Sequence, residues 1–236
     1  MNTWIILAAA VLPALLLWLY VWKRDAKPEP AKELIKAILW GVALCIPVAF
    51  AEYFIEHVLF SGGGPVSLFG TTIQAFFVAP IPEEAAKLFV LWLVLRKNPY
   101  YDEHYDGIVY AVSVGLGFAA VENFFYLYGN ESWVGTAIGR ALLAVPGHYA
   151  FAVLMGYYYS LYHFVERSAK NAIRILLVPV MAHGIYDALA MSGAVDPVIG
   201  GIAFFVLIYF CIKMQKEAHR KLITMIEKDR QYTMLS

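Results

Sequence analysis

Long apolar runs recur along the whole chain and limit its possible folds more than any other feature of the sequence. We distinguish seven, at residues 4–22, 34–60, 69–95, 107–128, 134–165, 172–191 and 197–212. Each is close to the ~20 residues that a helix needs to cross a bilayer. Because backbone groups in lipid must satisfy their own hydrogen bonds, these runs predict an all-α, polytopic membrane bundle.

Composition supports this fold class. The chain is 61% hydrophobic and 15% charged with no formal net charge, whereas soluble domains carry roughly 25% charged residues. The apolar runs lead us to expect the lipid bilayer as a partner. Because the chain has no surplus of basic residues, we expect no nucleic acid partner. Cys45 and Cys211 lie in apolar runs, so neither a disulfide framework nor a cysteine metal site is supported. The first run is expected to be a retained anchor, and residues 1–236 are expected to form a single domain.

The distribution of lysine and arginine predicts the orientation. Sixteen of the eighteen lie in or beside the loops after the first, third, fifth and seventh runs, and the other two, Lys87 and Arg140, lie within runs. Cytoplasmic loops carry the excess of these residues. The sequence therefore predicts seven spans with the amino terminus outside and the carboxyl terminus in the cytoplasm of a prokaryotic plasma membrane.

The third run is interrupted by two prolines that precede two glutamates and a lysine. Pro80 and Pro82 disfavour helix at the residues before them, so we expect a helix to restart at Pro82. Glu83 and Glu84 would then lie in its first turn, beside free N–H groups. A break at membrane depth predicts a polar cavity and, if the first half forms a separate segment, eight spans instead of seven. Charges at this depth cost at least ~2.5 kcal/mol, which favours a functional role.

Further polar residues inside the runs are Glu122, Asn123, Arg140, His148, His183 and Asp187. Counting helical rise places Glu83, Glu122, His148 and His183 between the outer leaflet and the midplane, so we expect a common cavity that opens toward the outer half of the membrane. His183 and Asp187 are four apart, which suits an aspartate that fixes the histidine tautomer. Glu83 and Lys87 are also four apart, so Lys87 is expected to neutralise Glu83 and leave Glu84 more available.

This set of residues permits hydrolysis by two routes. Zinc or another divalent cation would activate water if held by Glu84, Glu122, His148 and His183. Without metal, a glutamate would act as general base while a histidine, Asn123 or Arg140 stabilises the oxyanion. A proton- or ion-coupled transporter would use the same groups, although no inverted repeat is visible. A non-catalytic scaffold is the third interpretation.

Other residues have plainer interpretations. Gly115 and Gly117, near Glu122, are expected to allow close helix approach. The loop from Asp102 to Asp106 resembles a metal site in composition, but we interpret it as a surface loop in which Asp106 caps the next helix. Three residues near the end of the second run are expected at the membrane interface, or at the border of substrate entry: Glu52, Glu56 and His57.

Four ordered motifs carry a resemblance to a known family. They are Pro80-Ile-Pro-Glu-Glu-Ala-Ala-Lys87, Glu122-Asn123, Gly147-His148 and Ala182-His-Gly-Ile-Tyr-Asp187. In this order they resemble the PrsW family of intramembrane proteases, which is similar in its core to the CAAX prenyl-protease group. The resemblance extends from the second run through the sixth.

The resemblance implies an intramembrane endopeptidase, usually classed as a metalloprotease. Its expected substrate is a single-span anti-sigma factor, in which it would make the first, site-1 cut on the extracytoplasmic side. By motif, the implied catalytic residues are Glu83, Glu84, Glu122, His148 and His183. The implied supporting residues are Lys87, Asn123, Arg140 and Asp187.

Overall fold

Helices make up all the regular secondary structure of residues 2–60 and 67–235, which are the residues that this computed structural model describes. The main helices are α1 (Thr3–Trp22), α2 (Ala31–Phe60), α3 (Leu68–Phe77), α4 (Pro80–Leu95), α5 (Asp106–Leu127), α6 (Trp133–Gly139), α7 (Val145–Ser160), α8 (Ala169–Met191) and α9 (Pro197–Leu235). Short irregular helices are η1 (Arg140–Ala144), η2 (Leu161–Val165) and η3 (Ser192–Ala194). The predicted all-α fold class is confirmed.

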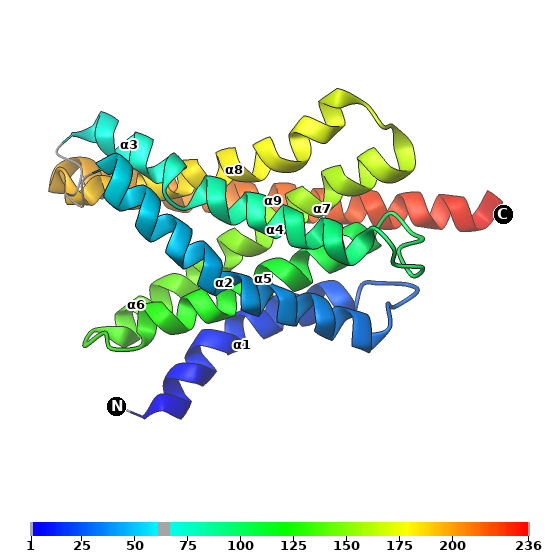
Figure 1. The fold of residues 1–236 in the computed structure, drawn as a ribbon, viewed down its shortest axis with the longest axis horizontal. Coiled ribbons are helices and arrows are strands. Elements are labelled where there is room, and N and C mark those ends of the chain that lie inside the picture. The colour runs from blue at the N-terminus through cyan, green and yellow to red at the C-terminus, as the bar shows by residue number, and fades with distance from the viewer. Residues whose placement is uncertain (1, 61–66, 236) are drawn as a thin grey trace.

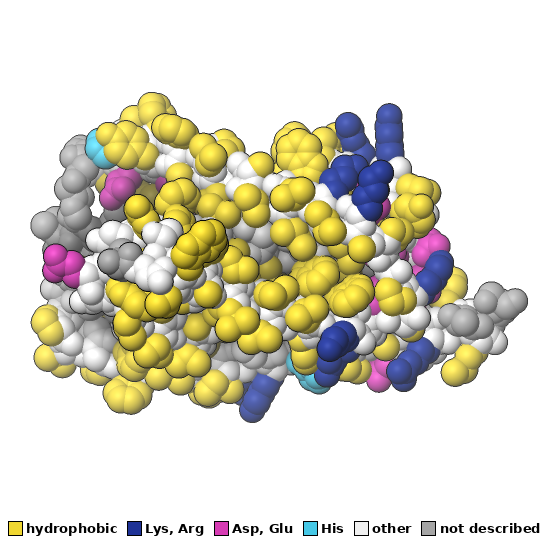
Figure 2. All heavy atoms as spheres, turned by 90° about the horizontal axis from the view of Figure 1, so that it is seen from below, with side chains coloured by type: hydrophobic (Ala, Val, Ile, Leu, Met, Phe, Trp, Pro, Cys, Tyr) yellow, Lys and Arg dark blue, Asp and Glu magenta, His cyan; other side chains and the backbone are white. Residues whose placement is uncertain are grey.

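Six of the described helical segments are long and apolar enough to cross a membrane. The pair α3 and α4, of 10 and 16 residues, supplies the seventh predicted segment in two pieces. Hydrophobic side chains cover the middle of the visible face, and Lys and Arg gather toward the end that holds the C-terminus (Figure 2). The chain is therefore a multi-pass membrane protein with broken helices.

The last helix is longer than the sequence predicts. The seventh apolar run ends at residue 212, but α9 continues past it to Leu235 and has 39 residues in all. At ~1.5 Å per residue this helix is roughly 58 Å long, well beyond the ~30 Å of a bilayer core. Its final turns therefore lie outside the hydrocarbon, beside the loops at that end of the bundle (Figure 1).

Helix α5 lies at the centre of the bundle, between α2 and α7 (Figure 1). Glycines allow these backbones to approach closely. A Cβ on Gly117 would lie 2.4 Å from the Ile38 carbonyl oxygen of α2, and one on Gly115 would lie 2.8 Å from the Ala152 Cβ of α7. The predicted close approach at these two glycines is confirmed, and it fixes α5 and α7, the helices that carry Glu122, Asn123 and His148.

The break in the third run is present, but the new helix begins earlier than predicted. Helix α3 ends at Phe77 and α4 begins at Pro80, so the prediction of a restart at Pro82 is wrong by two residues. The first backbone bond of α4 joins the Glu83 N–H to the Ala79 carbonyl at 2.9 Å. The first N–H groups of a helix have no intrahelical partner, so both prolines fit there without loss.

The loop between α4 and α5 is buried toward its α5 end, so its interpretation as a surface loop holds for Asp102, which is exposed, but is wrong for His104 and Asp106. His104 is 6% exposed and Asp106 is fully buried. Tyr105, not Asp106, is the N-cap of α5. The Asp106 carboxylate instead accepts hydrogen bonds from the preceding loop, at 3.0 Å from the Asp102 N–H and 2.7 Å from the Glu103 N–H. Contacts with other segments, which sequence spacing does not reveal, bury this end of the loop.

Candidate active site

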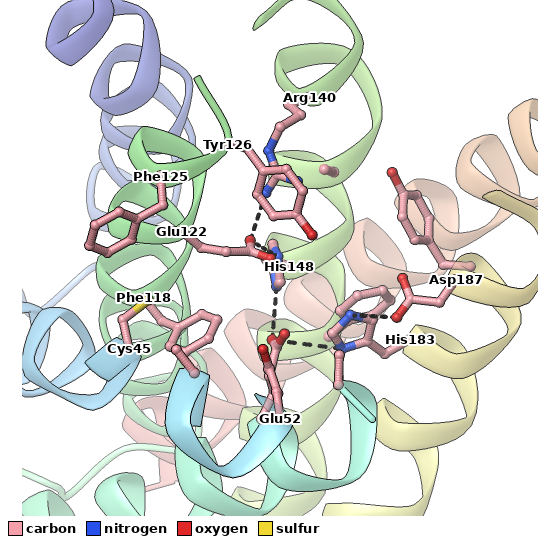
Figure 3. A pocket seen from close by; sticks show the side chains of 16 residues that line it. Cys45, Glu52, Phe118, Glu122, Phe125, Tyr126, Arg140, His148, His183 and Asp187 are labelled. Carbon is pink, nitrogen blue, oxygen red and sulfur yellow. Dashed lines mark hydrogen bonds and ion pairs between the residues drawn. The ribbon is translucent and has the colours of Figure 1, made fainter. Parts of the chain in front are cut away.

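A cavity of about 470 Å³ collects polar side chains from several helices (Figure 3). Its ionisable lining residues are Glu52, Glu83, Glu122, Arg140, His148, His183 and Asp187. The predicted convergence on one intramembrane polar cavity is therefore confirmed. Three of the predicted site residues, Glu84, Lys87 and Asn123, are buried but stand behind the lining.

Lys87 is the central cation of the site. Its ammonium lies 2.7 Å from Glu83 Oε2, 2.9 Å from Glu84 Oε1 and 3.3 Å from His148 Nδ1. The ammonium also lies 4.3 Å from the centroid of the Phe118 ring. The expectation that Lys87 neutralises Glu83 alone is wrong, because residues three and four apart share a helix face and both carboxylates reach it. Since buried charges require partners, this triad makes two adjacent buried glutamates tolerable.

His148 is held by a carboxylate on the neighbouring helix α5. Its Nε2 lies 2.8 Å from Glu122 Oε2. An ionised carboxylate only accepts hydrogen bonds, so Nε2 carries the proton and donates. The other nitrogen, Nδ1, is then an acceptor, and it faces the Lys87 ammonium. This pairing fixes the ring and leaves one basic nitrogen on the side of Glu83.

His183 is oriented mainly by Glu84. Its Nδ1 lies 3.1 Å from Glu84 Oε1, whereas its Nε2 lies 3.6 Å from Asp187 Oδ2, beyond a normal hydrogen bond. The ring of Phe151 stacks on the imidazole with centroids 4.7 Å apart. The sequence spacing pointed to Asp187 as the residue that fixes the tautomer, but the shorter contact comes from Glu84 on α4.

Arg140 links three helices at the edge of the cavity. It lies in the π-helical turn η1, a type of irregularity that is frequent at functional sites. Its guanidinium donates to Glu122 Oε2 at 2.6 Å and to Asn123 Oδ1 at 2.7 Å. The Asn123 amide in turn donates to the Ala10 carbonyl of α1 at 3.1 Å. Of the predicted oxyanion donors other than the histidines, Arg140 lines the cavity, while the Asn123 amide donates to α1.

The buried group Glu83, His148 and His183 could bind a metal ion. One ligand atom from each lies within 4.8 Å of the others, and Glu83 Oε2 is 4.0 Å from Nδ1 of both histidines. Two imidazoles and one carboxylate form a donor set that zinc accepts in hydrolases. The predicted set contained Glu84 and Glu122 in place of Glu83. Glu122 contacts His148 through Nε2 and leaves Nδ1 toward Glu83, the arrangement that orients a metal-binding imidazole. Glu84 contacts Nδ1 of His183, the nitrogen that also faces Glu83.

Glu52 is the polar lining residue to which sequence reasoning gave least weight. It projects from α2 into the cavity (Figure 3), and its Oε1 is buried without a hydrogen-bond partner among the described residues. The available signal was its position inside the second apolar run, eight residues before the end of α2. Of the two earlier interpretations, the border of a substrate site fits this position.

A wider groove of about 820 Å³ adjoins the cavity and shares Glu52, Arg140 and Asp187 with it. It extends between α2, α3, α8 and α9, where its lining includes Glu56 and Gln74. The polar residues of the cavity are thus reached through this groove. The groove is large enough to admit a segment of a polypeptide substrate as well as a small molecule.

Buried glutamates and histidines around a cavity of about 470 Å³, inside a multi-pass helical bundle, define a membrane-embedded hydrolase. Comparison with known sequences makes this class specific. The chain belongs to the PrsW family of intramembrane metalloproteases, whose profile matches residues 29–213. It is therefore an intramembrane peptidase, and the transporter interpretation is set aside.

Proteins named Protease PrsW are similar over most of their length. The one from Geobacillus kaustophilus is 36% identical over 189 residues, which cover 79% of this chain and 80% of the relative. The one from Bacillus subtilis is 36% identical over 77% of this chain and 81% of the relative. The Clostridioides difficile protein is 31% identical, with 77% of each chain covered. No solved structure matches this chain.

Proposed function

We propose that this protein hydrolyses a peptide bond of a single-span membrane protein at the group formed by Glu83, His148 and His183. The observation that supports this proposal most directly is the placement of the three side chains. All are buried, they come from three different helices, and all line the cavity. A base beside two imidazoles is the arrangement that water activation requires.

In this proposal Glu83 is the general base. It removes a proton from the attacking water and passes it to the leaving amine, while Lys87 holds the carboxylate in place. Arg140, which lines the same cavity, donates to the oxygen on which negative charge develops. Glu122 and Glu84 act through His148 and His183, whose rings they orient.

The metal-dependent route differs in the role of Glu83, which would be a ligand and not the base. A divalent cation such as zinc would be held by Glu83, His148 and His183. When bound, it supplies Lewis-acid chemistry that activates water and polarises a carbonyl. The charge of such an ion would add to that of Lys87, which already contacts Glu83 and His148. Glu84, with Oε2 buried and unpartnered among the described residues, would balance part of that charge.

The proposed cut is extracytoplasmic, the first cut in an anti-sigma-factor-like protein of a prokaryotic plasma membrane. Lys and Arg gather at the end that holds the C-terminus (Figure 2), which supports a cytoplasmic position for that end and an outer position for the other. The groove beside the cavity lies toward the opposite end, near the start of α9. A substrate segment leaving the membrane on the outer side would reach the cavity through it.

The test is cleavage of a single-span substrate by the purified protein in proteoliposomes. We expect Glu83→Gln and His183→Ala to abolish cleavage, and Glu131→Gln, in the exposed loop before α6, to leave it unchanged. Mass spectrometry of the fragments would locate the cut. Full activity in both site variants would refute the assigned residues, and a cut on the cytoplasmic side would refute the proposed orientation.

A further inference from the structure

A second group of acidic side chains, two buried and one partly exposed, lies at the other end of α5, outside the site just described. Carboxylate oxygens of Asp25, Glu103 and Asp106 all lie within 4.8 Å of one another. They come from the loop after α1, the loop after α4 and the first residue of α5. By helical rise Asp106 is ~24 Å from Glu122, so the two acidic groups are separate.

Two carboxylate oxygens in this group have no partner. Asp25 is 8% exposed, and its Oδ1 accepts from the Lys27 N–H at 3.0 Å. Asp106 is fully buried, and its Oδ2 accepts from two loop N–H groups. Within the described part of the chain, Asp25 Oδ2 and Asp106 Oδ1 are buried without a hydrogen-bond donor. Leaving a buried polar atom unsatisfied costs ~1–3 kcal/mol, and more for a charged group.

Neighbouring residues increase the negative charge instead of balancing it. Glu29 is 7% exposed and accepts a hydrogen bond from the Tyr110 hydroxyl. Asp229 of α9 accepts from the His104 and Tyr105 N–H groups, at 2.8 Å each. Burial is the main cause that raises the pKa of Glu103, and the Asp229 charge adds to it. The negative charges of Glu29 and Asp229 therefore disfavour the ionised forms of Asp25, Glu103 and Asp106 unless a cation is bound.

Lys27, two residues after Asp25, is paired with a carboxylate outside this group. Lys27 forms an ion pair with Asp102 at 2.6 Å, and its side chain is 63% exposed. Burial is the main cause that raises the pKa of Asp25, and the negative charges of Asp229 and Asp102 raise it further. Among the described residues, no lysine or arginine forms an ion pair with Asp25, Glu103 or Asp106, in contrast to Lys87 in the active site.

We propose that Asp25, Glu103 and Asp106 bind a hard divalent cation, Mg²⁺ or Ca²⁺. Carboxylate oxygens alone are the donors that these ions prefer, and the imidazole of His104 is engaged by Asp229. A cavity of about 240 Å³ lined by Asp25, Glu103 and Asp229 leaves space for the water ligands that Mg²⁺ retains. Two exposed arginines, Arg24 and Arg230, also line this cavity. The ion would fasten the α1–α2 loop to the start of α5, the helix that carries Glu122.

The experiment measures thermal unfolding of the full-length protein in detergent after removal of metals by a chelator. Added Mg²⁺ or Ca²⁺ is expected to raise the Tm of the wild type by roughly 3–6 °C at ten times the Kd. Potassium chloride at matched ionic strength is expected to have little effect. Terbium luminescence, sensitised by Tyr105 in the wall of the same cavity, provides a direct binding signal that Ca²⁺ should displace.

Variants assign the response to this site. Asp25→Asn retains an oxygen for the Lys27 N–H, and Glu103→Gln changes a partly exposed side chain; both should lose the cation response. Asp102→Asn, in the same loop, and Glu83→Gln, in the active site, should retain it. Absence of a Tm shift in the wild type, or an equal shift in Asp25→Asn and Glu103→Gln, would overturn the proposal. Stabilisation by acid alone, without a cation effect, would also overturn it.

Discussion

Two buried acidic groups lie along α5, and they neutralise their charge in different ways. In the active site, Glu83 and Glu84 share the Lys87 ammonium, and Glu122 contacts Arg140 and a histidine. At the other end of the helix, Asp25, Glu103 and Asp106 meet mainly other carboxylates and backbone N–H groups.

The difference teaches how a buried carboxylate becomes tolerable. Where a lysine or arginine lies within the bundle, the chain supplies its own counter-charge, and the histidines add nitrogen donors suited to zinc. Where carboxylates lie together without a lysine or arginine, their negative charge must be neutralised by a proton or by a hard cation from solution. Four predictions test this contrast, beginning with the largest effect.

Replacing the proposed general base should have the largest effect. Glu83→Gln keeps the size of the side chain and removes its basicity, so cleavage should fall by ~10²–10⁴-fold. The measurement is kcat/KM for a single-span substrate in proteoliposomes. The matched control at the other acidic group is Glu29→Gln, which should retain activity. Equal losses in both variants would mean that the two groups are not functionally distinct.

Removing the internal cation should destabilise the protein strongly. Lys87→Met leaves two buried glutamates without their shared partner, a change that costs ~3–5 kcal/mol when a buried ion pair is broken. Lys27→Met breaks only an exposed pair and should cost at most ~1 kcal/mol. Thermal unfolding of both variants in detergent compares them directly. Similar losses of stability would refute the contrast between the two groups.

The contact between α9 and the buried loop should have an intermediate effect. Asp229 accepts from the His104 and Tyr105 N–H groups, and Asp229→Asn would keep only one acceptor oxygen. We expect a loss of ~1–3 kcal/mol, as for other buried N–H groups left unsatisfied. Hydrogen exchange of the loop amides should accelerate, whereas exposed Glu227→Gln should leave it unchanged. Unchanged exchange in Asp229→Asn would show that this contact does not hold the loop.

The smallest effect concerns pH. Burial is the main cause that raises the pKa of Glu29 from 4.5 to about 7, and the charges of Asp25 and Asp102 contribute. The unfolded chain releases this proton first, so stability should fall as pH rises from about 4.5 to about 7. In Glu29→Gln, with a chelator present, this part of the fall should disappear in thermal unfolding measured across that range. A profile identical to the wild type would contradict the shifted pKa.

Part of the site was predictable because lipid makes polar residues conspicuous. Glu83, Glu122, His148 and His183 stand out in apolar runs, and helical rise placed them at similar depth. Their partners were less predictable. Lys87 was paired with Glu83 alone because spacing reports one helix at a time, whereas its contact with His148 crosses to α7.

The second acidic group was harder to recognise for the same reason. The loop from Asp102 to Asp106 was visible in the sequence, but Asp25 lies 77 residues earlier than Asp102 and Asp229 lies 127 residues later. Nothing in local spacing indicates that these segments meet. The whole loop was therefore interpreted as exposed, although its residues from His104 to Asp106 are buried and α9 contacts the first two of them.

The sequence by itself determined the class of fold, the break in the third segment and the ionisable residues within apolar runs. These residues are costly to place in a membrane and therefore indicate a function. All three features follow from local rules, because each helix in a membrane must satisfy its own backbone. Only the tertiary structure decided which carboxylate faces the cavity, which nitrogen of each histidine is held, and where a second acidic group forms. Those outcomes depend on contacts between helices, which the close packing at Gly115 and Gly117 fixes and which no single segment encodes.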